Sequence, residues 1–110
     1  MSSFLTEEQE NILRKASDMW GKTFQKDMAI EECSELILAI SHFKRDRIHA
    51  DMLLEEVADV LIICHQMQLD EDKHGIVQTI IDNKMRRLAK RVEADNPNER
   101  FKEFSCFYKP

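Results

Sequence analysis

The sequence predicts an all-α fold, a four-helix bundle-like architecture, on three observations. Glycine and proline are scarce, at 2 each in 110 residues, and 34% of the residues are charged, a composition typical of long amphipathic helices. Apolar residues recur at helical spacing along four segments, which short polar or glycine-containing stretches separate. A chain of this length has room for one modest core, so we expect residues 1–110 to form a single domain.

The first two predicted helices meet at Gly21. The stretch Thr6–Gln9 has the form of a capping box, which opens a helix. An apolar stripe follows it, and Gly21 ends this helix. The second helix is predicted from Thr23 to Lys44 and ends in the charged turn Lys44–Arg47, because basic residues suit a helix C-terminus.

The third predicted helix runs from an Asp51 cap to Leu69 and is apolar nearly all round. Such a helix is usually buried on several sides. In a chain this short a second subunit is the expected cover, so we predict a homodimer or homotetramer. The apolar positions outside its acidic stripe are Leu53, Leu54, Val57, Leu61 and Ile62.

A loop over Asp70–Gly75 leads to the fourth predicted helix, from Ile76 to Val92, which is rich in lysine and arginine. The Asp95–Asn98 stretch stops this helix. We therefore expect a helical core over residues 20–92 and a C-terminal tail over 95–110. The tail contains four aromatic residues, and the sequence leaves open whether they pack on the bundle or on a partner.

Two acidic motifs separate this sequence from an ordinary helical bundle. Glu31-Glu32-Cys33-Ser34-Glu35 is matched 24 residues later by Glu55-Glu56-Val57-Ala58-Asp59. At about 100° per residue, Glu32 and Glu35 share one helix face with apolar residues, and Glu56 and Asp59 repeat the arrangement. Four carboxylates are therefore expected on stripes that face the core.

These four carboxylates are candidate ligands of a metal ion. A buried carboxylate must be neutralised, paired or metal-bound, and neither stripe carries a lysine or arginine. Oxygen ligands suit a hard cation such as Mg²⁺ or Mn²⁺. The alternative is a solvated acidic face, which is the usual meaning of a single such pair.

A basic stripe on the fourth helix is the candidate phosphate-binding element. Lys84 and Arg87 lie at i and i+3, and Arg91 lies one turn further. Acid cluster, divalent cation and basic stripe together are a device for phosphoryl chemistry. The alternative is an ordinary solvated helix C-terminus.

Composition excludes several other classes of protein. The net charge of −5 argues against general nucleic-acid binding. Three cysteines without paired spacing indicate reduced thiols and a cytoplasmic protein, with Cys33 and Cys64 as core-packing residues. The polar N-terminus predicts no signal peptide, and the longest apolar run is too short to cross a membrane.

The paired acidic motif resembles the EExxE…ExxD signature of the all-α NTP pyrophosphatase superfamily, and its MazG-like branch most closely. The resemblance spans Trp20 to Arg91 and includes Trp20-Gly21, Gln25, Met28-Ala29-Ile30 and Lys84-Met85-Arg86-Arg87-Leu88. Some relatives carry a second arginine where this chain has Leu88.

The resemblance implies a MazG fold and hydrolysis of a nucleoside triphosphate between its α and β phosphates, giving a monophosphate and pyrophosphate. It implies that Glu32, Glu35, Glu56 and Asp59 bind Mg²⁺. Glu35 is the candidate for orienting or deprotonating the attacking water, and Glu31 is the second candidate. Because Glu31 lies about 100° round the helix from Glu32, surface exposure is its expected position.

The sequence also offers a place for the nucleoside. Trp20, Phe24 and Gln25 lead into the second helix near the acids, and an aromatic face with an amide can hold a base. The alternative for Trp20 is core packing.

Three other functions stay open at this point. Phosphoribosyl-ATP pyrophosphatases share the acidic signature. A non-catalytic helical dimerisation module could bind a cation with the same acids. A nucleic-acid binder acting through the fourth helix is disfavoured by the overall charge.

Overall fold

The computed structural model describes residues 3–95, and within that range the chain is all-helical, with four helices and no strand. The helices are α1 (Glu7–Trp20), α2 (Lys22–Lys44), α3 (Ala50–Glu71) and α4 (Ile76–Ala94). By its internal contacts the chain divides into two compact units, Met1–Lys73 and His74–Pro110, and each is described by itself. The predicted tail falls outside the described residues, apart from Asp95.

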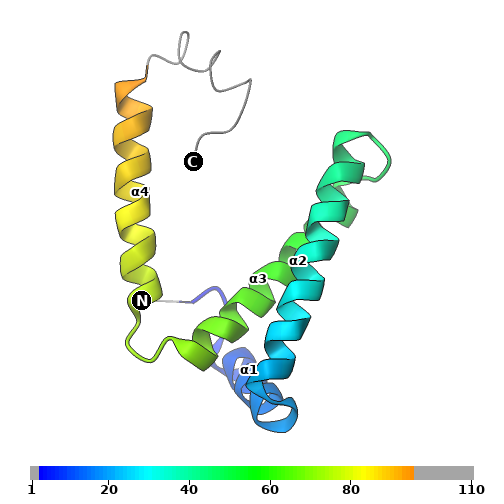
Figure 1. Ribbon diagram of the computed structural model, residues 1–110, viewed down its shortest axis with the longest axis vertical. Helices are drawn as coiled ribbons and strands as arrows, with labels where there is room; N and C mark the ends of the chain where they lie inside the picture. Colours follow the sequence, from blue (N-terminus) through cyan, green and yellow to red (C-terminus); the bar gives the residue numbers. More distant parts are fainter. Residues whose placement is uncertain (1–2, 96–110) are drawn as a thin grey trace. The chain divides into compact units, whose positions relative to one another are not determined.

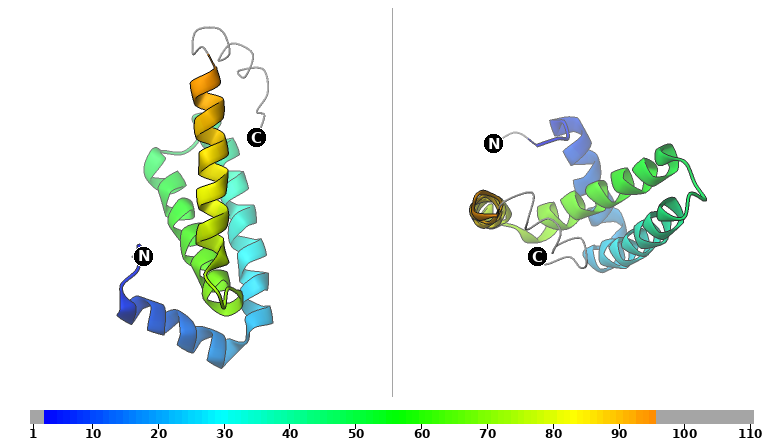
Figure 2. Two further views of the ribbon diagram at one scale, coloured as in Figure 1. Left: turned by 90° about the vertical axis from the view of Figure 1, so that its left-hand side faces the viewer. Right: turned by 90° about the horizontal axis from the view of Figure 1, so that it is seen from above.

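The first unit is an α2–α3 hairpin with α1 across one end. The two long helices run side by side in opposite directions, and α1 contacts both of them where α2 begins and α3 ends (Figures 1 and 2). The core between the helices is small: the buried apolar side chains among residues 3–95 are Ala29, Ala39 and Ile63. Two of the three are alanines on α2, which allow α3 to approach closely.

The helix starts follow the expected capping chemistry only in part. The predicted capping box is confirmed, since the Thr6 hydroxyl accepts from the Gln9 amide and the Gln9 side chain accepts from the Thr6 amide. Gly21 ends α1, as predicted, at φ 92°. The prediction that Asp51 caps α3 is wrong. The N-cap of α3 is His49, whose side chain makes no capping hydrogen bond. Asp51 lies instead in the first turn of α3, where a negatively charged side chain interacts favourably with the helix dipole.

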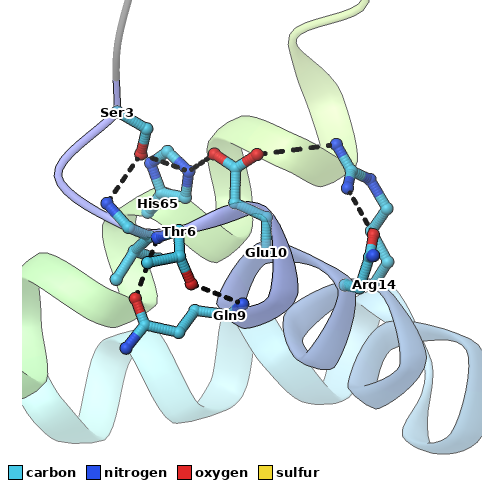
Figure 3. A network of polar contacts seen from close by, with 8 residues as sticks. Ser3, Thr6, Gln9, Glu10, Arg14 and His65 are labelled. Carbon is cyan, nitrogen blue, oxygen red and sulfur yellow. Dashed lines mark hydrogen bonds and ion pairs between the residues drawn. The ribbon is translucent and has the colours of Figure 1, made fainter.

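A hydrogen bond to His65 fixes the first part of the described chain on α3. Glu10 Oε2 lies 2.7 Å from His65 Nε2, and Ser3 Oγ lies 3.4 Å from the same nitrogen (Figure 3). The His65 hydrogen bond is the main cause that lowers the pKa of Glu10 below its ordinary value. The N-terminal half of α1 is therefore held to the C-terminal half of α3 by polar contacts.

Much of the outer surface of the hairpin is apolar and exposed. Ile37 on α2 is 69% exposed and Leu61 on α3 is 50% exposed. The prediction that Cys33 and Cys64 pack in the core is wrong for this chain, since both are exposed. The sequence predicts burial at both positions because the outward-facing stripes of α2 and α3 are as apolar as the stripes that face the core. None of the described helices has the length and apolar character needed to span a membrane.

Candidate functional site

The four predicted metal ligands come from the two helices of the hairpin. Glu32 and Glu35 lie on α2, and Glu56 and Asp59 lie on α3. Glu32, Glu56 and Asp59 are half-buried, whereas Glu35 is exposed. The predicted burial of all four in an apolar interior is therefore wrong for Glu35 and only partial for the others, because the core beneath them is thin.

Glu32 lies beside Asp59, and Glu35 lies beside Glu56, where side chains of α2 and α3 line the same hollows. We call these four side chains the acid cluster. Burial raises the pKa of Glu32, and the charge of Asp59 and a hydrogen bond with Glu35 raise it further. Burial also raises the pKa of Glu56, followed by the charges of Glu35 and Asp59. Like charges act this way only at short range, in keeping with the shared hollows that Glu32 and Asp59, and Glu35 and Glu56, line. The binding of one ion by all four acids stays a prediction.

One oxygen of the acid cluster bears on whether these residues fit a cation. Glu56 Oε2 is shielded from solvent and has no hydrogen-bond partner among the described residues. A buried polar atom without a partner is costly. A set of carboxylate oxygens is what Mg²⁺ and Mn²⁺ bind, so the donor set and the unpartnered oxygen both fit such an ion.

Glu31 lies closer to this cluster than its helical angle suggests. It is exposed, as predicted. Nevertheless Glu31, Glu32 and Glu35 each offer an oxygen atom within 4.8 Å of the others. The direction in which a side chain leaves the helix does not fix the position of its carboxylate, because a flexible glutamate reaches across an angle of about 100°.

A hollow of about 200 Å³ opens beside Glu32 and Asp59. Its walls contain the predicted residues Trp20 and Gln25, together with Phe24. The rings of Trp20 and Phe24 meet edge to face with centroids 6.2 Å apart, and Gln25 is only 5% exposed. The remaining lining residues are Met28, Ile62 and Ile63. We call this the aromatic hollow.

A second hollow, of about 330 Å³, opens beside Glu35 and Glu56. His42 and Met52 line it, and neither was predicted as a site residue. Their spacing from the acids gave a signal, since Met52 precedes Glu56 by four residues and His42 follows Glu35 by seven. One hollow therefore adjoins Glu32 and Asp59, and the other adjoins Glu35 and Glu56.

The predicted phosphate-binding residues lie in the other unit. Lys84 and Arg87 are exposed on α4, and Arg91 on the same helix is half-buried. Their spacing on α4 is the one the sequence predicts. Their part in the site stays a prediction, because α4 belongs to the unit His74–Pro110.

Comparison of the chain with protein-family models, with curated proteins and with solved structures finds no match. The candidate site therefore stands on its own residues: an acid cluster, an unpartnered carboxylate oxygen and the two adjoining hollows.

Proposed function

We propose that this protein is a Mg²⁺-dependent nucleotide pyrophosphohydrolase that cleaves a (d)NTP to the monophosphate and pyrophosphate. The observation that carries the proposal is the convergence of Glu32, Glu35, Glu56 and Asp59, with Glu56 Oε2 shielded and unpartnered. Like charges gathered this closely repel one another. A bound divalent cation would offset that repulsion, and it could also bind the phosphates of a substrate.

The four acids would hold the ion, with Mn²⁺ as a substitute for Mg²⁺. When bound, the ion supplies a polarised phosphoryl group and a water of lowered pKa. Glu35 is the exposed member of the acid cluster, so it can reach a water molecule and act as the orienting or deprotonating group. Glu31 is the second candidate, since its oxygen lies within 4.8 Å of one on Glu35.

The aromatic hollow is the proposed nucleoside site. Trp20 and Phe24 offer ring surface for the base, and Gln25 offers an amide with both donors and an acceptor. Glu32 and Asp59 line the same hollow, so a nucleoside there has its α-phosphate beside the acid cluster. Lys84, Arg87 and Arg91 are proposed to neutralise the phosphates that the ion does not contact.

We further propose that the chain works as a homodimer or homotetramer that completes a MazG-like helical bundle. An exposed stripe on α2 contains Ile30, Cys33, Ile37 and Ile40 at helical spacing. A matching stripe on α3 contains Leu54, Leu61 and Cys64. Cys33 lies near enough to Cys64 to add to the effect of burial in raising the Cys64 pKa. The two stripes therefore adjoin, and a second hairpin would cover them.

The experiment that tests the proposed function measures pyrophosphate release from a panel of (d)NTPs with and without Mg²⁺. The wild-type protein should release pyrophosphate only when Mg²⁺ is present. The Glu56→Gln variant should lose the activity by about 100-fold or more, because a neutral amide is a poor ligand for a hard cation.

Asp27→Asn is the matched control, since it makes the same change at an exposed acid of α2 outside the cluster. It should keep wild-type turnover. Release from no nucleotide would leave the cation-binding dimerisation module as the better description, and hydrolysis confined to phosphoribosyl-ATP would identify that substrate instead.

A further inference from the structure

The corner between α1 and α2, which carries Trp20, is held to the end of α3 by a buried chain of hydrogen bonds. Gln66 Nε2 donates to the Leu13 carbonyl at 2.8 Å and to Ser17 Oγ at 2.5 Å. Ser17 Oγ in turn donates to Asp70 Oδ1 at 2.7 Å. Gln66 is 1% exposed, Asp70 5% and Ser17 8%. Three polar side chains thus bond to one another and to the Leu13 carbonyl where a helical protein usually places apolar side chains.

The same corner is fastened from its other side. Lys22 Nζ, in the first turn of α2, donates to the Asp70 carbonyl at 3.2 Å. Ser17 and Lys22 flank the Trp20–Gly21 step, so Asp70 holds both helices that meet there. One further turn along α2, Lys26 pairs with Glu71 at 2.6 Å.

The position of this corner sets one wall of the aromatic hollow. Trp20, Phe24 and Gln25 come from the corner, whereas Asp59, Ile62 and Ile63 come from α3. None of Ser17, Gln66 and Asp70 lines the hollow. Trp20 is three residues after Ser17, on the same side of α1, so a shift of Ser17 against Asp70 moves the indole.

Stability alone does not account for the polar chain. Asp70 Oδ2 is shielded from solvent and has no hydrogen-bond partner among residues 3–95. A buried carboxylate with one oxygen unpartnered is costly, and apolar side chains of similar size would avoid that cost. Unlike apolar contacts, hydrogen bonds have a preferred geometry, so the polar chain fixes the angle and register at which α1 meets α3.

We infer that Ser17, Gln66 and Asp70 are positioning residues, which set the width of the aromatic hollow and with it the affinity for the nucleoside part of the substrate. This inference rests on the proposed function for its kinetic consequence. Its structural consequence, the fixed placement of Trp20, holds for the protein alone.

The chain contains one tryptophan, one tyrosine and six phenylalanines, so the long-wavelength tryptophan band of the near-ultraviolet circular dichroism spectrum, where tyrosine and phenylalanine do not absorb, reports on Trp20. In the Ser17→Ala variant this band should lose most of its intensity, while the far-ultraviolet helix signal stays. The KM for a (d)NTP should rise about tenfold, the loss expected for one misplaced contact, with kcat within about twofold of wild type.

Glu10→Ala is the control, because it breaks the polar contact of α1 with His65 on α3, nearly three turns away from Trp20. It should leave the tryptophan band and the KM unchanged. Lys22→Met removes the hydrogen bond on the other side of the corner, and because Lys22 is exposed it changes no buried side chain. It should weaken the tryptophan band and raise the KM, as Ser17→Ala does.

The inference is overturned if Ser17→Ala and Lys22→Met keep the wild-type tryptophan band, or if Glu10→Ala alters it equally. A wild-type protein without pyrophosphatase activity would refute the proposed function, yet the tryptophan band would still decide the positioning role. A Ser17→Ala variant that fails to fold leaves the decision to Lys22→Met.

Discussion

The acid cluster makes the stability of the protein depend on pH. The ordinary pKa of Glu32 and Glu56 is 4.5, and both values are raised in the folded chain, first by burial and then by neighbouring carboxylates. Between 4.5 and the raised values the folded state binds more protons than the unfolded state. The contribution of these two groups to stability therefore falls as pH rises through that window.

We accordingly expect the metal-free protein to melt at a higher temperature near pH 5 than near pH 7. Mg²⁺ should raise the melting temperature at the higher pH, because a ligand of the native state stabilises it. Thermal melts at both pH values, with EDTA and with Mg²⁺, check this. A metal-free melting temperature that rises steadily from pH 5 to pH 7 would contradict the prediction.

The Glu56→Gln variant separates charge repulsion from metal binding at one residue. Without metal at neutral pH it should melt above wild type, because the substitution removes a negative charge that Glu35 and Asp59 repel. With Mg²⁺ it should gain less than wild type, because one ligand is lost. Calorimetry of both proteins, with Asp27→Asn beside them, measures the two effects.

At the scale of the elements, the α1–α2 corner depends on Gly21. This residue has φ 92° and ψ 150°, a conformation that is essentially restricted to glycine. No atom lies within 4 Å of the position that a Cβ would take. The cost of a side chain here is therefore conformational and not steric crowding.

Gly21→Ala should lower the free energy of unfolding by about 1–3 kcal/mol. Gly75→Ala is the comparison, since Gly75 also has open space around it and lies in the left-handed helical region at φ 69°. That substitution should cost less, about 1 kcal/mol. Urea unfolding of both variants gives the two values, and a Gly21→Ala variant as stable as wild type would refute the argument.

At the scale of the whole molecule, the proposed assembly depends on the exposed apolar stripes of the hairpin. A chain whose buried apolar side chains between residues 3 and 95 are two alanines and an isoleucine has little core of its own. Burial of further apolar surface against a second copy would supply the missing stabilisation.

The Ile37→Glu variant should therefore shift the protein from dimer or tetramer to monomer, because a carboxylate within the interface would be desolvated. Light scattering after gel filtration measures the mass. Ile12→Glu is the control, since Ile12 is 63% exposed on α1, outside the stripes, and assembly should persist. A wild-type protein that is monomeric at high concentration would contradict the proposed interface.

The sequence by itself determined the helices and the pairing of the acids, because both follow from local periodicity. Glu32 with Glu35 and Glu56 with Asp59 share a helix face wherever those helices form, and in the hairpin the acids of α2 and α3 line the same two hollows. Capping at Thr6 and the stop at Gly21 are likewise local.

Only the tertiary structure decided the fate of Asp70, which the sequence placed in a loop and which is in fact buried within the last turn of α3. Its polar partner Ser17 is 53 residues away, beyond the reach of any periodicity. The same holds for the exposure of Cys33 and for the hollow that His42 lines. The residues of a helix show which of its faces is apolar, but whether that face is covered depends on helices elsewhere in the chain.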